Sequence, residues 1–198
     1  INEIAWAGTK ASSFDEWLEL RNATGFLIDL SGWKIKSSDT EGPEITLLGT
    51  IAANGFYLIE RTNDQTTTAA ANLTATFGNG LLNTTCEVLY LHNAQDTVVD
   101  QTVCKSDGTW PAGKASPDYI SMERVDATST GSSVSNWANN NLIQYNNKDA
   151  ANNWINGTPG QANSTATSLT TTPSRIPWRE GPARSTRRSS AASCWRSA

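Results

Sequence analysis

The chain has 198 residues, of which 37% are hydrophobic, and this length suffices for one domain with a sizeable core. It contains no run of about 18 apolar residues, so no membrane span is expected. Residues 1–163 carry 9 Lys and Arg against 18 Asp and Glu, whereas residues 164–198 carry six Arg and one Glu. Because an acidic surface repels phosphates, we do not expect the first part of the chain to bind nucleic acid.

Short apolar runs, separated by clusters of turn-forming residues, favour an all-β domain. In chain order, the predicted strands are Ile1–Ala7, Glu16–Asn22, Gly32–Ser37, Glu44–Leu48, Gly55–Arg61, Cys86–His92, Thr97–Val103 and Tyr119–Val125. No helix is required, although residues 66–73 could form a turn or two. Strands at this spacing predict a β-sandwich or a barrel.

The composition changes near residue 163, which we take as the end of the domain. Residues 164–174 form a Ser/Thr-rich linker of a kind that stays disordered. The remainder has arginine but no lysine. We interpret residues 164–198 as a disordered basic tail, or, from residue 173 on, as an out-of-frame translation.

Cys86 and Cys104 enclose a segment that is typical of a β-hairpin. If Asn93 and Thr97 close its loop, Cys86 and Cys104 face each other, and facing Cβ atoms lie about 4.5–5.5 Å apart, near the disulfide range. A disulfide would place the protein outside the cell or at its surface; two buried thiols are the alternative. With His92 the only histidine, we expect no zinc site and no cofactor.

A series of short motifs follows in a fixed order along residues 1–163. They are I-x-E-I with Gly8, DEWLELxN (15–22), DLSGWKI (29–35), GFYLIER (55–61), GLLN (80–83), EVLYL (87–91), VD (99–100), SMER (121–124), Trp137 and TPGxxN (158–163). This order resembles the lamin tail domain, which occurs in nuclear lamins and widely in bacterial proteins. The positions that carry the resemblance are Glu3, Gly8, Glu16, Trp17, Glu19, Gly32, Trp33, Glu60, Arg61, Glu123, Arg124, Trp137, Pro159, Gly160 and Asn163.

The resemblance implies an immunoglobulin-like β-sandwich that acts as a non-catalytic module. Lamin tails are platforms for proteins and chromatin, and bacterial copies are attached to secreted or surface proteins. The cysteine pair favours a bacterial, exported member. We therefore expect a binding or anchoring module that recognises a protein or a cell-surface polymer through its loops and sheet edges.

Carboxylates on the predicted strands allow a second hypothesis, a carbohydrate-active enzyme. Such enzymes place two carboxyl groups across a cleft, and Glu3, Glu19 and Glu123 approach one another if their strands pair. Arginines close by in sequence, Arg21, Arg61 and Arg124, offer ion-pair partners instead. We therefore interpret these carboxylates as structural. A third hypothesis is that the Arg-rich tail binds nucleic acid.

Two tryptophans fall in predicted loops, where exposed aromatic side chains contact carbohydrates or proteins. Trp110 and Trp154 are therefore the candidate partner contacts, unless they pack over the ends of the sandwich. Residues 37–42 have too few fixed oxygen atoms to support a calcium site.

Overall fold

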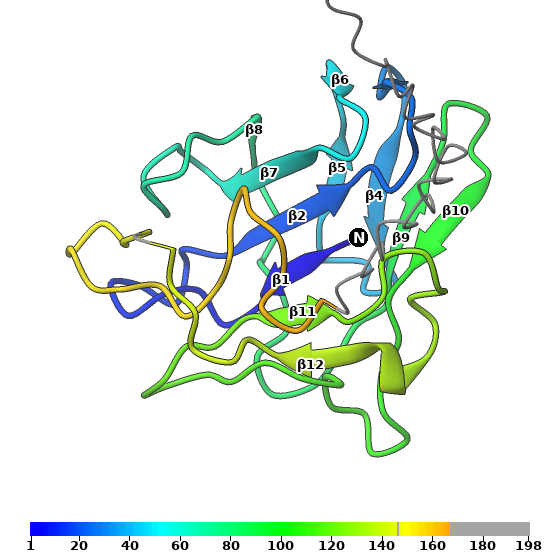
Figure 1. The fold of residues 1–198 in the computed structure, drawn as a ribbon. Helices are drawn as coiled ribbons and strands as arrows, with labels where there is room; N and C mark the ends of the chain where they lie inside the picture. Colours follow the sequence, from blue (N-terminus) through cyan, green and yellow to red (C-terminus); the bar gives the residue numbers. More distant parts are fainter. Residues whose placement is uncertain (146, 167–198) are drawn as a thin grey trace, which may run out of the picture. The chain divides into compact units, whose positions relative to one another are not determined.

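The structure, a computed structural model, describes residues 1–145 and 147–166. Its larger sheet has six strands in the order β12 (Trp137–Asn139), β11 (Met122–Arg124), β1 (Glu3–Ala5), β2 (Trp17–Arg21), β7 (Phe56–Arg61) and β8 (Leu73–Ala75). The smaller sheet has four strands in the order β10 (Val98–Gln101), β9 (Leu89–His92), β4 (Lys34–Ser37) and β5 (Glu44–Thr46). Figure 1 shows the strands of the two sheets crossing in projection.

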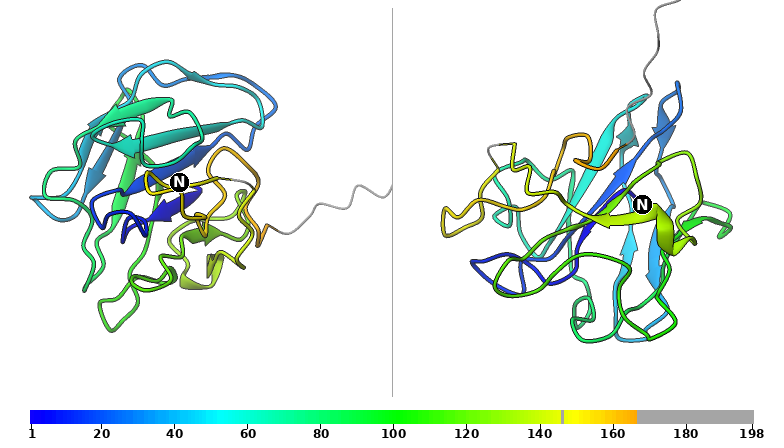
Figure 2. Two further views of the ribbon diagram at one scale, coloured as in Figure 1. Left: turned by 90° about the vertical axis from the view of Figure 1, so that its left-hand side faces the viewer. Right: turned by 60° about the horizontal axis from the view of Figure 1, so that its bottom comes forward.

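The core lies between the two sheets and follows from alternation along the strands. On β2, Leu18 and Leu20 are each 1% exposed and belong to the main core cluster. Trp17 and Glu19 point to the other face of the six-stranded sheet. That outer face is covered by the chain around residues 156–165, which crosses β1 and β2 (Figures 1 and 2). Both faces of the central strands are therefore buried.

All eight predicted strands contain an observed strand, but the observed strands are shorter at most ends. Within residues 1–145 and 147–166, four further strands were not predicted: β3 (Ile28–Asp29), β6 (Thr50–Ile51), β8 and β12. β3 and β6 pair as a two-stranded ribbon, and β8 runs parallel to β7. These segments have only two or three residues, so they carry too little alternation to be recognised.

Residues 66–72 form no helix; the helical segment in the described part of the chain is one 3₁₀ turn, η1 (Val134–Asn136). No helix in that part has the length and apolar character needed to cross a membrane. The predicted Arg-rich tail falls, from residue 167 on, outside the described residues. The predicted domain end at residue 163 stays a prediction, although Thr165 still bonds to Glu123.

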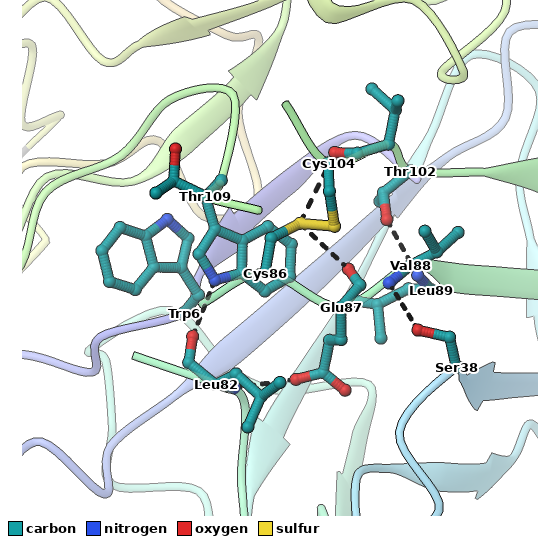
Figure 3. Close-up of a disulfide and its surroundings, with 12 residues drawn as sticks. Trp6, Ser38, Leu82, Cys86, Glu87, Val88, Leu89, Thr102, Cys104 and Thr109 are labelled. Carbon is teal, nitrogen blue, oxygen red and sulfur yellow. Dashed lines mark hydrogen bonds between the residues drawn. A yellow bond between two sulfur atoms is a disulfide. The ribbon is translucent and has the colours of Figure 1, made fainter. Parts of the chain in front are cut away.

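The predicted hairpin forms between β9 and β10, and its cysteines are joined (Figure 3). Asn93 donates its backbone N–H to Thr97, as the expected loop requires. The expected register holds only for the first pair, His92 and Val98, because a bulge at Val99 shifts the pairing by one residue. The disulfide between Cys86 and Cys104 still closes, with their Cα atoms 5.6 Å apart, because both residues lie beyond the paired part of the strands.

Candidate functional site

Three glutamates form a row across the outer face of the six-stranded sheet. Glu3 on β1 lies directly opposite Glu123 on β11 and Glu19 on β2. All three are 0% exposed. The structure therefore brings together the three carboxyl groups that the enzyme hypothesis required, but it buries them. We call these three residues the carboxyl row.

The central carboxyl group of the row is held by hydrogen bonds from Ser121 and from residues 156–165, which we call the covering segment. Glu3 accepts bonds from the Thr158 N–H (2.8 Å), the Thr158 hydroxyl (2.6 Å) and the Ser121 hydroxyl (2.5 Å). Burial, together with the charge of Glu123, raises the pKa of Glu3 to about 8 despite these bonds. Glu3 is therefore mostly protonated at neutral pH.

The two flanking carboxyl groups bind the same segment. Glu19 accepts the backbone N–H of Gly160 (2.5 Å) and a bond from Asn2 (2.8 Å), and burial, then the charge of Glu3, raises its pKa well above the usual value. Glu123 accepts bonds from Asn140 (2.6 Å) and from the backbone and hydroxyl of Thr165 (3.1 and 3.0 Å). The row anchors residues 158–165 to the sheet.

The TPGxxN motif supplies much of this anchoring. Gly160 is in the left-handed region (φ 75°), and its N–H reaches Glu19. Asn163 donates to the backbone carbonyls of Asn2 (3.1 Å) and Arg124 (2.8 Å). Pro159 presents its carbonyl oxygen to Asn147. The motif therefore joins the covering segment to β1 and β11.

The arginine partners predicted from neighbouring positions, Arg21, Arg61 and Arg124, are wrong in all three cases. Arg21 lies over the Phe56 ring (5.5 Å) instead of pairing with Glu19. Arg61 pairs with Glu16 (3.0 Å), while Glu60 accepts the backbone N–H groups of residues 66 and 67. Glu16 also accepts the N–H of residue 81. Glu60 thus holds a loop through backbone N–H groups alone, and Glu16 does so together with Arg61.

The two candidate loop tryptophans differ in exposure. Trp110 is 5% exposed; it stacks on Trp6 at 6.1 Å and donates its indole N–H to the carbonyl of Leu82. It is therefore not an exposed contact, because it is buried in the main core cluster against Trp6. Trp154 is 43% exposed, with the ammonium of Lys148 over its ring at 4.7 Å.

The remaining residues that carry the family resemblance have structural roles. Gly8 has φ 76° and lies against the backbone of residues 12–13, so a side chain would not fit there; Gly32 also has positive φ (78°). Trp17 is buried beneath the covering segment, and Trp33 is half-buried against the main core. Trp137 donates its indole N–H to Gly131 and lies under the guanidinium of Arg124.

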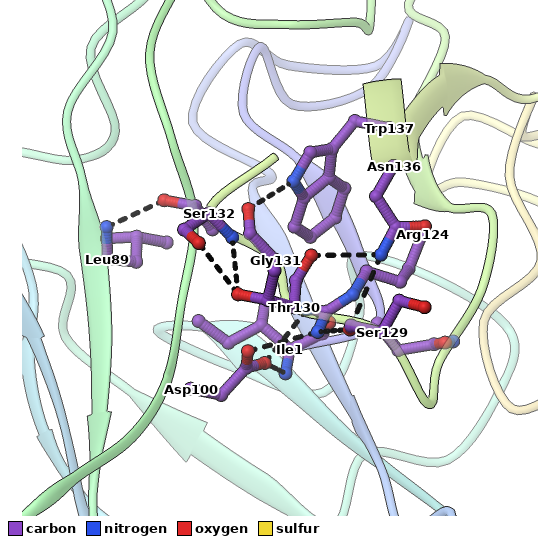
Figure 4. Close-up of polar contacts among 12 residues, drawn as sticks. Ile1, Leu89, Asp100, Arg124, Ser129, Thr130, Gly131, Ser132, Asn136 and Trp137 are labelled. Carbon is purple, nitrogen blue, oxygen red and sulfur yellow. Dashed lines mark hydrogen bonds and ion pairs between the residues drawn. The ribbon is translucent and has the colours of Figure 1, made fainter. Parts of the chain in front are cut away.

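An ion pair joins the two sheets near their edges (Figure 4). Arg124 on β11 donates to both carboxylate oxygens of Asp100 on β10, at 2.9 and 3.0 Å. Asp100 also contacts the Ile1 ammonium at 2.5 Å. Burial raises the pKa of Asp100, but these two cations outweigh it and hold the pKa at about 2. The pair is therefore charged over the physiological range.

Next to this ion pair, a cleft with a volume of about 470 Å³ opens between the sheets. Its walls include Leu20, Leu30, Ile51 and Leu91, and its mouth includes Val98 and Val99. No motif in the sequence indicates this cleft. It forms where β2, β6, β9 and β10 meet the loop after β11, so only the tertiary structure brings its residues together.

The model of the Lamin Tail Domain family matches residues 1–106. The chain belongs to the lamin tail domain family. The match covers β1 to β10 and both disulfide cysteines, whereas the resemblance was expected to continue to residue 163. No curated protein and no solved structure matches the chain.

Lamin tail domains are immunoglobulin-like, non-enzymatic modules, and the all-β architecture agrees with that class. In the described part of this lamin tail domain, no group of three or more His, Cys, Asp or Glu residues is arranged to hold a metal ion. The carboxyl row has no exposed oxygen for a substrate, since its three residues are 0% exposed. Its chemistry is that of a structural anchor.

Proposed function

We propose that this lamin tail domain is a non-catalytic binding module of an exported protein, and that it recognises a protein or a cell-surface polymer. The observation that carries the proposal is the burial and hydrogen bonding of the carboxyl row. Each of the three groups is buried and accepts hydrogen bonds from neighbouring segments of the same chain. A glycosidase needs two carboxyl groups that face a substrate, and this row faces the covering segment instead.

The disulfide supports the exported location, because such bonds persist in oxidising compartments. Trp154 supports recognition of a partner, since its half-exposed ring lies on a loop and offers an apolar surface beside the cation of Lys148. A loop contact of this kind needs no catalytic group. It also does not involve the carboxyl row, whose role is to hold the fold together.

The test measures binding and turnover on the same samples. The full chain is incubated with purified polysaccharides, with insoluble cell-wall material and with chromogenic glycosides, and both retention and hydrolysis are recorded. We expect retention without hydrolysis. Trp154→Ala should weaken retention, whereas Phe26→Ala, which removes an 81% exposed aromatic ring at a different loop, should not. Hydrolysis that Glu123→Gln abolishes in a folded variant would overturn the proposal.

A further inference from the structure

The cleft between the sheets has the dimensions of a small-molecule site. Its volume of about 470 Å³ falls within the range of ligand pockets, about 300–1,000 Å³. Leu20 and Ile51 line it from one side and Leu91 from the β9 side. Neutral polar residues, among them Gln101 and Ser132, complete the lining. The apolar part of these walls favours a ligand with an apolar body, because burying its surface is favourable by about 25 cal/mol per Å².

The Asp100 carboxylate and the Arg124 guanidinium at the cleft compensate one another. Arg124 binds both oxygens of Asp100, at 2.9 and 3.0 Å. Arg21 also borders the cleft, but its guanidinium lies over Phe56, on the face of β2 opposite Leu20. An ionic ligand would therefore lose hydration without gaining a free counter-ion.

One polar group at the cleft is left without a partner. Arg124 is 5% exposed, and its Nε atom has no hydrogen-bond partner among the described residues. A buried donor of this kind costs free energy until an acceptor reaches it. A ligand that offers a carbonyl or ether oxygen would supply that acceptor.

The cleft does not suit an added β-strand. Although β10 is an edge strand, a Cβ placed on Gly131 would lie 2.2 Å from the carbonyl oxygen of Gln101. The loop after β11 thus lies against this part of the edge, and a partner strand has no room to pair there. Strand addition is therefore excluded at the point where β10 lines the cleft.

We infer that the cleft binds a small, neutral, apolar molecule that carries one hydrogen-bond acceptor, such as a medium-chain ketone or ester. This inference goes beyond the proposed function. Partner recognition through the Trp154 loop uses other residues, so either proposal can fail alone.

The first experiment titrates the full chain with Nile red, a neutral apolar dye, and follows its fluorescence. Val99 and Val134 provide a matched pair, since both are exposed (47% and 42%) but only Val99 lines the cleft. Val99→Glu places a carboxylate at the mouth of the cleft. It should raise the Kd for Nile red about tenfold, equivalent to about 1.4 kcal/mol. Val134→Glu should leave the Kd within about twofold. Equal affinities of these two variants, or no binding to the unchanged chain, would overturn the inference.

The second experiment tests ligand chemistry without a variant. 2-Decanone, decane and decanoate compete with Nile red, and methyl chemical shifts of the unchanged chain locate each ligand. We expect 2-decanone to compete at about tenfold lower concentration than decanoate, and to shift the methyl signals of Leu91 and Val98 but not that of Leu48. Decane, which lacks an acceptor, should also compete less well than 2-decanone. Equal competition by all three, or shifts outside the cleft, would refute the assignment.

Discussion

The hydroxyl of Thr158 lies between the carboxyl groups of two facing residues, 2.6 Å from Glu3 and 3.2 Å from Glu123. A hydroxyl has one proton to donate, so it cannot fully satisfy both carboxylates in their ionised form. A proton on Glu3 would remove the repulsion and give Glu3 a donor of its own. Burial, and after it the charge of Glu123, raises the pKa of Glu3, and the bonds from Thr158 offset this only in part.

The first prediction concerns the pH dependence of stability. The folded-state pKa of Glu3 is about 8 against an ordinary 4.5, so the folded state binds a proton that the unfolded state releases. This stabilising contribution is fully present below pH 4.5 and is lost as the pH rises through about 8. We expect the Tm to fall between pH 5 and pH 9, by about 2–4 °C for each kcal/mol lost.

Glu3→Gln tests the origin of this dependence. Glutamine keeps the shape and an acceptor oxygen but has no proton to release, so the variant should lose less Tm between pH 5 and pH 9 than the unchanged chain. Glu44→Gln, at a side chain that is 67% exposed, is the control and should retain the full dependence. An identical pH profile for Glu3→Gln and the unchanged chain would show that Glu3 is already ionised at neutral pH.

The second prediction concerns the ion pair between the sheets. Asp100→Ala leaves Arg124 buried without its carboxylate, and breaking such a buried pair costs about 3–5 kcal/mol in the free energy of unfolding. The exposed pair of Lys34 and Glu44, 3.5 Å apart, is the control, because Lys34→Ala should cost about 0–1 kcal/mol. Urea unfolding at pH 7 measures both. Similar costs for the two variants would contradict the role of Asp100.

Much of the fold can be predicted from residue patterns. The alternation of Leu18 and Leu20 with Trp17 and Glu19 identifies β2 and its core face, and the spacing of the cysteines indicates their disulfide. The predicted register of that hairpin is correct only as far as Val98, because nothing in the sequence marks the bulge at Val99. Strands of two residues, such as β3, depend on pairing with a distant segment and leave no local pattern.

The candidate site was less predictable than the fold. The alternation of side chains along a strand explains part of the error in the predicted arginine partners. Arg124 follows Glu123 directly, and neighbouring residues of a strand point to opposite faces. Glu123 therefore faces the covering segment, while Arg124 faces Asp100. The donors to the carboxyl row come from residues such as Thr158, which is 155 positions from Glu3. The TPGxxN motif was the one available signal for that contact.

The third prediction concerns the disulfide. Its removal by Cys86→Ser with Cys104→Ser should lower the free energy of unfolding by about 3 kcal/mol, as expected for a loop of this size. Cys194 is replaced by serine throughout, so that only the pair is counted. In the chain that keeps Cys86 and Cys104, intact mass after alkylation should show no modified thiol without reductant and two modified thiols with reductant. Two modified thiols without reductant would show that the bond is absent in solution.

The fourth prediction uses two glycines to probe the contact between the covering segment and the sheet. A Cβ on Gly157 would lie 2.8 Å from the Trp17 ring and 3.1 Å from both the Glu3 carboxyl group and the Ser121 hydroxyl. Gly157→Ala should therefore push the covering segment away from the carboxyl row and cost about 1–3 kcal/mol, as overpacking of a well-packed site does.

Gly25→Ala is the matched control for this substitution, because its Cβ meets no atom within 4 Å and its φ does not require glycine. It should change the free energy of unfolding by less than about 0.5 kcal/mol. Urea unfolding compares the two variants, and hydrogen exchange at Gly160 reports the contact directly, since this N–H is bound to Glu19. Faster exchange in Gly157→Ala alone is expected. Unchanged exchange and stability would mean that residues 157–160 do not pack on the carboxyl row, and the structural role assigned to Glu3, Glu19 and Glu123 would then be wrong.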